Sequence, residues 1–103
     1  MALKGRTPNK AERRHMDAVT NLGCVVCLLH YRSFSPAEIH HVFGKTRKDS
    51  HLFVLPLCFS HHREGNAEGM ISRHPYKARF QAAYGSEEEL LQVVKNLLAN
   101  KET

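Results

Sequence analysis

The sequence predicts an α+β fold, in which a short strand–loop–strand–helix unit is flanked by one N-terminal helix and two C-terminal helices. Apolar residues recur at helical spacing near both ends of the chain, whereas the middle holds two short segments rich in β-branched and aromatic residues. The segment between them is polar and contains glycine, as expected of a loop. At 103 residues the chain is expected to form a single domain over residues 8–103, preceded by a flexible basic arm at residues 1–7.

The first helix is predicted to begin at Thr7-Pro8, with threonine as the N-cap and proline at the first helical position, and to end at Gly23. Residues 24–27 are then expected to form a tight knuckle, followed by a loop that runs through Pro36.

Two antiparallel strands are predicted at residues 37–42 and 51–55, with Pro56 ending the second strand. A short helix is expected from Phe59 to about Gly65.

The two C-terminal helices are predicted from their start signals. His74-Pro75 is expected to open the first of them, which Gly85 would stop. The run Ser86-Glu87-Glu88-Glu89 has the pattern of a capping box and precedes a segment with a broad apolar face.

The charge distribution favours a polyanionic partner. The formal net charge is +5, and two groups of basic residues stand out: Lys4, Arg6, Lys10, Arg13 and Arg14 near the N-terminus, and Lys45, Arg47 and Lys48 in the predicted loop. The acids Glu87, Glu88 and Glu89 lie far in sequence from both groups, a segregation that suits a phosphate backbone.

The hydropathy pattern predicts a soluble, cytosolic protein that does not enter a membrane. No apolar run approaches the roughly 20 residues of a membrane span. The start Met-Ala-Leu-Lys-Gly-Arg also lacks the apolar segment of a signal peptide.

Two spaced motifs predict a structural zinc site. Cys24-x-x-Cys27 and Cys58-x-x-His61 together supply the four ligands that tetrahedral zinc prefers, and they use all three cysteines. A redox Cys-x-x-Cys is the rival interpretation, but it would need a thioredoxin-like strand–helix context and would leave Cys58 unexplained. Ordinary buried cysteines beside a surface histidine are the structural alternative.

The order of these motifs resembles that of a known nuclease superfamily. Glu38-Ile39-His40-His41-Val42 stands between the two halves of the zinc site, and His62 directly follows its last ligand. Residues 24–65 thereby resemble the zinc-stapled His-Asn-His (HNH) endonucleases, whose ββα-metal, treble-clef-like unit cleaves nucleic acid. With His74, Phe80, Tyr84-Gly85 and the leucine-rich end, the whole chain resembles the phage Ref family of RecA-dependent, recombination-enhancing nucleases.

The resemblance implies that His41 is the general base and that His40, His62 and His74 bind a second, catalytic metal ion. That ion would be Mg²⁺ or Mn²⁺, although Zn²⁺ could also occupy a neutral histidine shell. Adjacent strand residues point to opposite faces, so His40 and His41 can serve one centre only if the strand ends or bulges there.

The sequence departs from the superfamily pattern at one position. The central asparagine that steadies the base is missing, and Asp49 and His51 lie nearest to its place. Either residue could orient His41, and either could instead face solvent.

The resulting hypothesis is a metal-dependent DNA endonuclease with little sequence specificity, acting in phage-type recombination in the cytoplasm of a bacterial host. Dependence on a RecA-type filament comes with the resemblance alone. Contacts to the DNA phosphates are expected from Lys45, Arg47, Lys48, Arg13 and Arg14.

Two other functions remain open. A zinc-stapled nucleic-acid-binding module without catalysis would not require the histidines outside the zinc site. A small redox or metal-handling protein would lack affinity for DNA.

Overall fold

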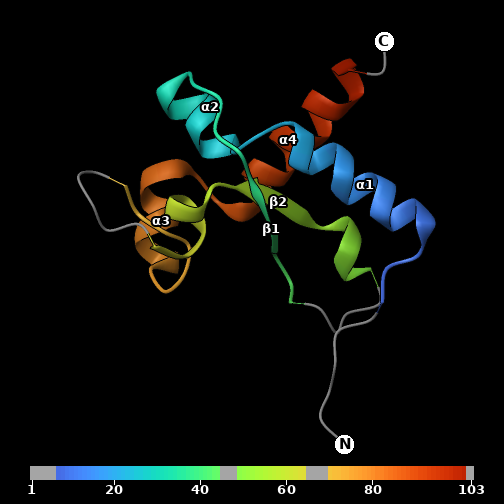
Figure 1. The fold of residues 1–103 in the computed structure, drawn as a ribbon. Helices are drawn as coiled ribbons and strands as arrows, with labels where there is room; N and C mark the ends of the chain where they lie inside the picture. The colour runs from blue at the N-terminus through green and yellow to red at the C-terminus, as the bar shows by residue number, and fades with distance from the viewer. Residues whose placement is uncertain (1–6, 45–48, 65–69, 102–103) are drawn as a thin grey trace, which may run out of the picture.

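A two-stranded antiparallel hairpin, formed by β1 (Glu38–His41) and β2 (Val54–Leu57), lies at the centre of the structure (Figure 1). The computed structural model describes residues 7–44, 49–64 and 70–101. The helices are α1 (Lys10–Asn21), α2 (Val25–Tyr31), α3 (Lys77–Tyr84) and α4 (Glu87–Lys101), with a 3-10 turn η1 (Ser50–Leu52) before β2 and a short π-helical segment η2 (Ser60–Glu64) after it. The predicted α+β class is confirmed.

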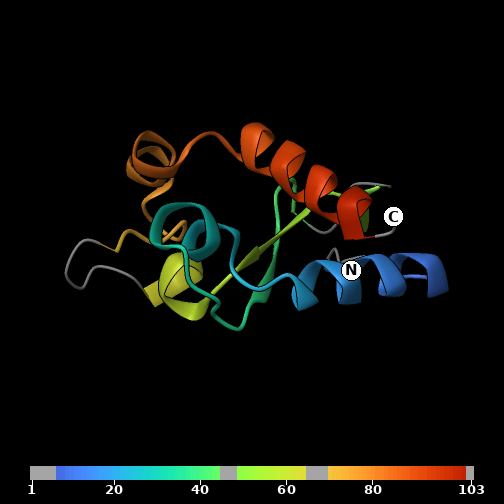
Figure 2. The same cartoon turned by 90° about the horizontal axis from the view of Figure 1, so that it is seen from above.

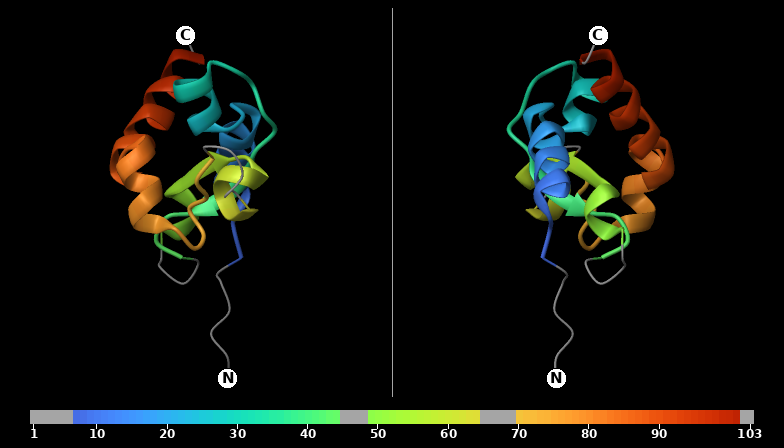
Figure 3. Two further views of the ribbon diagram at one scale, coloured as in Figure 1. Left: turned by 90° about the vertical axis from the view of Figure 1, so that its left-hand side faces the viewer. Right: turned by 90° about the vertical axis from the view of Figure 1, so that its right-hand side faces the viewer.

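The helices cover the hairpin from two sides. α1 lies along one side and α4 along the other, as Figures 2 and 3 show from different directions. α2, η2 and α3 gather at one end of the hairpin (Figure 2). The core between these layers is apolar and includes Val19, Val26, Leu55, Leu57, Phe80, Leu90 and Val94.

The register of the hairpin places the two adjacent histidines of β1. His40 pairs with Leu55, and His41, the last residue of β1, pairs with Val54. Both histidines therefore lie in the paired part of β1, and their side chains leave opposite faces of the strand. None of the helices in the described part of the chain is long and apolar enough to cross a membrane.

The first helix begins at Lys10, so the predicted start at Thr7-Pro8 is wrong. Asn9 is the N-cap: its side chain accepts from the backbone N–H of Glu12 at 2.8 Å, and the Glu12 carboxylate accepts from the N–H of Asn9 at 2.9 Å. A full capping box needs an acceptor three residues after the cap, and Thr7 has Lys10 there.

The predicted loop after Cys27 is also wrong, because α2 continues to Tyr31. Cys24 acts as its N-cap, with the sulfur 3.5 Å from the backbone nitrogen of Cys27, and Val25 and Val26 anchor the first turn in the core. The helix ends at Arg32, whose φ of 51° is left-handed.

The second strand begins later than predicted, at Val54 rather than at residue 51. His51 lies in η1, and Pro56 lies inside β2 opposite Ile39 rather than ending it. A two-stranded sheet has only edge strands, and a proline nitrogen that faces away from the partner strand loses no ladder hydrogen bond.

The third helix begins at Lys77, later than the predicted start at His74-Pro75. The N–H of Arg73 donates to the carbonyl of His61 and the N–H of His74 to that of His62, so this segment is tied to η2 and must turn before a helix can begin. The capping box at Ser86 is confirmed: Ser86 N–H donates to Glu89, and Glu89 N–H donates to the Ser86 hydroxyl.

Gly23→Ala is expected to destabilise the fold by roughly 2 kcal/mol, because φ is +78° there and an added Cβ would lie 3.0 Å from the carbonyl oxygen of Ser35. That oxygen cannot move away easily, because it accepts a hydrogen bond from the N–H of Cys24. The added Cβ would also meet the Phe34 ring, but this ring is exposed and can rotate outward. Gly44→Ala is the matched control, with a φ of +75° and open space around the added Cβ, and should cost only about 1 kcal/mol. Urea unfolding of both variants measures the difference, and equal losses would contradict the steric argument.

Candidate functional site

Two groups of metal-ligating side chains occur among the described residues. In each group the ligand atoms lie within 4.8 Å of one another. One group is Cys24, Cys27, Cys58 and His61, and the other is His40, His62 and His74. The two groups adjoin, because η2 contributes His61 to the first and His62 to the second.

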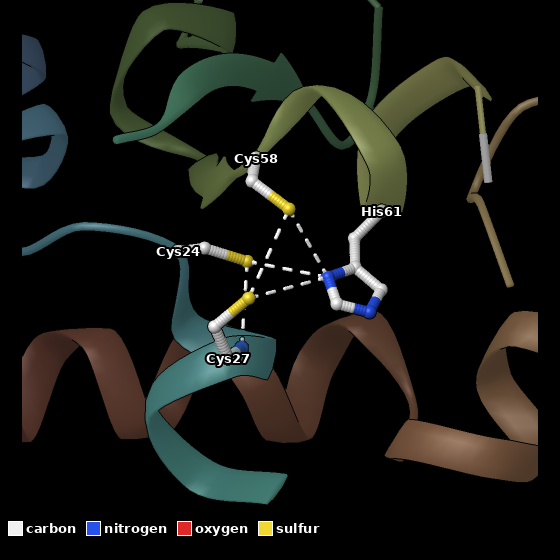
Figure 4. A group of neighbouring side chains, drawn as sticks. All are labelled: Cys24, Cys27, Cys58 and His61. Atoms are coloured by element: carbon white, nitrogen blue, oxygen red, sulfur yellow. Dashed lines mark hydrogen bonds between the residues drawn. The ribbon is translucent and has the colours of Figure 1, made fainter. Parts of the chain in front are cut away.

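The cysteine group is brought together by the start of α2 and the β2–η2 connection. Figure 4 shows the three sulfurs and Nδ1 of His61 turned toward one another. Nδ1 lies 3.6 Å from the sulfurs of Cys24 and Cys27 and 3.2 Å from that of Cys58, and the sulfurs of Cys27 and Cys58 are 3.9 Å apart.

These separations fit a tetrahedral metal ion. With bonds of about 2.3 Å to sulfur and about 2.0 Å to nitrogen, the edges of a zinc tetrahedron are roughly 3.8 Å between sulfurs and roughly 3.5 Å between sulfur and nitrogen. The structure matches both values, and the donor set is one that zinc prefers. The residues can therefore hold a structural metal ion.

Burial makes the charge state of the cysteine group depend on a bound cation. Burial raises the pKa of the Cys24 thiol to about 12 and raises that of Cys58, so these thiols become thiolates only beside a compensating positive charge. Burial, together with nearby His30, lowers the pKa of His61 and keeps its imidazole neutral, as a ligand must be. Among the residues that the structure describes, its buried Nε2 has no hydrogen-bond partner, and its ring packs against the rings of Tyr31 and Tyr84.

The histidine group draws on three separate segments. His40 comes from β1, His62 from η2 and His74 from the turn that precedes α3, and their ring centroids lie 5.1–5.3 Å apart. His40 is buried, His62 is half-buried and His74 is exposed, so the group opens to solvent on one side. The backbone hydrogen bonds from residues 73 and 74 to η2 hold His74 beside His62.

Two carboxylates contact imidazoles of this group. Glu87 Oε2 lies 2.6 Å from Nε2 of His40, and Glu38 Oε1 lies 2.8 Å from Nδ1 of His62. Burial raises the pKa of Glu87, but the His40 hydrogen bond and the Arg73 charge outweigh it and leave the pKa below its ordinary value. The Arg63 and His62 hydrogen bonds lower the pKa of Glu38. Both carboxylates are therefore ionised at neutral pH.

The nitrogens of His40 and His62 that do not contact a carboxylate are available to a metal, and His74 contributes a third imidazole. Burial lowers the pKa of His62 more than Glu38 raises it, and burial and the nearby His40 lower the pKa of His74. Neutral imidazoles with one nitrogen bound to a carboxylate are the usual state of histidine ligands in metal sites.

His41 has a different neighbour from His40. Its Nε2 lies 3.0 Å from Nδ1 of His51, and the two rings are edge to face. His51 is buried, so of its two predicted roles the solvent-facing one is wrong. The structure thus places His41 at the end of the strand that carries His40, but outside the group of three imidazoles.

The predicted phosphate contacts are only partly described. Arg13 and Arg14 are exposed on α1. Lys45, Arg47 and Lys48, as well as residues 1–6 of the predicted basic arm, lie outside the described residues.

The two carboxylates near the histidine group are not among the site residues predicted from the sequence. Glu87 belongs to the run predicted as a capping box, remote from the basic and histidine-rich segments, and nothing in the sequence indicates its contact with His40, 47 residues away. Glu38 carried a usable signal, because residues two apart on a strand share a face and Glu38 is two residues before His40.

The sequence model of the protein family described as "Recombination enhancement, RecA-dependent nuclease" matches residues 8–99. The chain belongs to this family. The match runs from before α1 into the last turns of α4, so it includes both groups of ligands and the hairpin. The predicted resemblance to the Ref family is confirmed, and nucleic acid is the substrate class of this nuclease.

If the cysteine group holds a structural metal ion, a strong chelator is expected to unfold the nuclease. Metal binding to a site of this kind supplies on the order of 10 kcal/mol that is coupled to folding. Circular dichroism and the melting temperature, recorded before and after chelation and after adding zinc back, measure the effect. A melting temperature indifferent to chelation would contradict a structural metal.

Replacing His61 is expected to lower the stability of the fold more than replacing its neighbour His62. His61→Ala removes a buried ligand and is expected to destabilise the nuclease by several kcal/mol. His62→Ala changes a half-buried residue of the other group and should cost about 1 kcal/mol. Equal losses in urea unfolding would mean that the two groups act as one site.

Proposed function

We propose that this chain is a metal-dependent DNA endonuclease of the HNH type, with β1, β2 and η2 as its ββα-metal unit. The observation that supports this most directly is the convergence of His40, His62 and His74 beside a strand end that carries His41 held by His51. A module that only bound nucleic acid would need neither feature.

In this proposal His40, His62 and His74 hold the catalytic metal, Mg²⁺ or Mn²⁺. A metal ion bound there would supply positive charge to offset the charge that develops on the phosphate. Three neutral imidazoles hold Mn²⁺ better than Mg²⁺, which prefers oxygen ligands, and Zn²⁺ can occupy the same shell. The exposed side of the group, at His74, is where a phosphate oxygen would approach.

His41 is proposed as the general base that takes a proton from the attacking water. The ordinary pKa of imidazole, about 6.5, suits this role near neutral pH. In-line displacement puts the attacking water and the leaving oxygen on opposite sides of the phosphorus. A base that contacts η1, rather than the metal-binding imidazoles, is compatible with that arrangement.

His51 is proposed to take the place of the missing central asparagine. Its Nδ1 is within hydrogen-bond distance of His41, and its own position is fixed by burial in η1. One ring therefore orients the other.

The cysteine group is proposed to bind zinc. It would join α2 to η2 and thereby fix the segment that carries His62. One member of the His61-His62 pair would then maintain the fold and the other would take part in the reaction.

The proposed substrate is DNA, bound through its phosphates with weak sequence preference and strong salt dependence. Arg13 and Arg14 are proposed to contact the backbone, together with Lys45, Arg47 and Lys48. The family description supports dependence on a RecA-type filament and a role in recombination, proposed here for a phage or prophage protein in the bacterial cytoplasm.

His41→Ala is expected to lower the cleavage rate about 100-fold or more, the usual contribution of a general base, and to leave DNA binding unchanged. Cleavage of single-stranded, nicked and duplex DNA is measured with Mg²⁺ or Mn²⁺, with and without a RecA filament. His15→Ala, a half-buried histidine on α1, is the control and should cleave normally. Absence of cleavage by the wild type under every condition, with DNA binding intact, would favour the non-catalytic binding module.

His51→Ala is expected to lower kcat by up to about 100-fold with little change in KM, because a misplaced base fails only in the transition state. Asp49→Ala is the matched variant, since Asp49 is the other residue near the position of the missing asparagine. If Asp49→Ala lost activity and His51→Ala did not, the assignment of His51 would be wrong.

A further inference from the structure

We infer that Glu87, and to a smaller extent Glu38, are positioning residues that determine which nitrogen His40 and His62 offer to the catalytic metal and how tightly they bind it. The inference rests on the proposed function, because it assumes that the three imidazoles hold a metal. It adds the carboxylates, which neither the family description nor the sequence motifs assign to the site.

Glu87 determines the protonation pattern of His40. An ionised carboxylate can only accept hydrogen bonds, so the 2.6 Å contact between Glu87 Oε2 and His40 Nε2 puts the imidazole proton on Nε2. Nδ1 then keeps its lone pair and is the atom that His40 offers to a metal. Both side chains are about 4% exposed, so water competes little for this contact.

Glu38 produces the opposite pattern in His62. Its Oε1 accepts from Nδ1 at 2.8 Å, which leaves Nε2 of His62 as the ligand atom. Arg63 binds both oxygens of Glu38, at 3.2 and 2.7 Å, and fixes the carboxylate. The Glu38 side chain is 33% exposed, so we expect a weaker effect than that of Glu87.

Glu87 also reaches the third histidine indirectly. Its Oε1 accepts from Nε of Arg73 at 3.0 Å, and Arg73 is the residue before His74. The ion pair between Glu87 and Arg73 anchors the segment of residues 73 and 74, whose backbone N–H groups donate to carbonyls of η2. One buried carboxylate therefore holds His40 directly and the segment of His74 through Arg73.

The start of α4 favours the charge on this carboxylate. Glu87 is the first residue of the 15-residue α4, where the helix dipole stabilises negative charge. A charged carboxylate on the far nitrogen raises the electron density of an imidazole and thus its affinity for a metal. Two of the three histidines are thus in contact with a negatively charged carboxylate.

Titration with Mn²⁺, of protein that keeps its structural zinc, tests the inference. Glu87→Gln keeps the shape of the side chain but removes the charge, and is expected to raise the Kd for Mn²⁺ about 10- to 100-fold, the usual effect of losing such a partner. Glu38→Gln should raise it less. Glu88→Gln, at the exposed neighbouring position on α4, is the matched control and should leave the Kd unchanged.

Nitrogen-15 NMR of the imidazoles, recorded before Mn²⁺ is added, tests the assigned tautomers directly. The wild type should carry its proton on Nε2 in His40 and on Nδ1 in His62. The reverse pattern in the wild type would overturn the inference, even if Glu87→Gln failed to fold.

The remaining outcomes separate the inference from the proposed function. If the wild type binds Mn²⁺ through His40, as judged by loss of binding in His40→Ala, and Glu87→Gln binds it equally well, the inference is wrong and the proposed function stands. If the wild type binds no Mn²⁺ at this site, both are overturned.

Discussion

The contact between three thiols and one imidazole is the constraint on which the other features of the site depend. It connects Cys24 and Cys27 at the start of α2 with Cys58 and His61 around the start of η2. Because η2 is only five residues long, it has little stability of its own. Once the position of His61 is fixed, its neighbour His62 is fixed too. The same holds for the carbonyls of both residues, which accept hydrogen bonds from the N–H groups of residues 73 and 74.

The two pairs of adjacent histidines illustrate how local geometry divides one cluster into several tasks. In β1, successive side chains leave opposite faces of the strand, so His40 meets Glu87 while His41 meets His51. In η2, His61 points to the sulfurs and His62 to Glu38. Identical side chains thus acquire different partners because the backbone turns between them.

The histidine group has fewer uncompensated positive charges around it than the net charge of the chain suggests. The chain carries a formal charge of +5, yet each of two histidines in the candidate centre contacts a carboxylate, and each carboxylate also binds an arginine. The positive charge of Arg63 and Arg73 offsets the cost of placing carboxylates there. Net charge predicts the class of partner, whereas the local arrangement of charges determines what the imidazoles can bind.

The sequence by itself determined the α+β class, the two ligand motifs and the family, because these depend on spacing within short segments. Cys-x-x-Cys, Cys-x-x-His and the capping box at Ser86 are local patterns whose geometry follows from one turn of chain. Only the tertiary structure decided the register that places Pro56 inside β2, the burial of His51 against His41 and the contact of Glu87 with His40. These depend on packing between segments far apart in the chain, for which a single sequence carries no periodic signal.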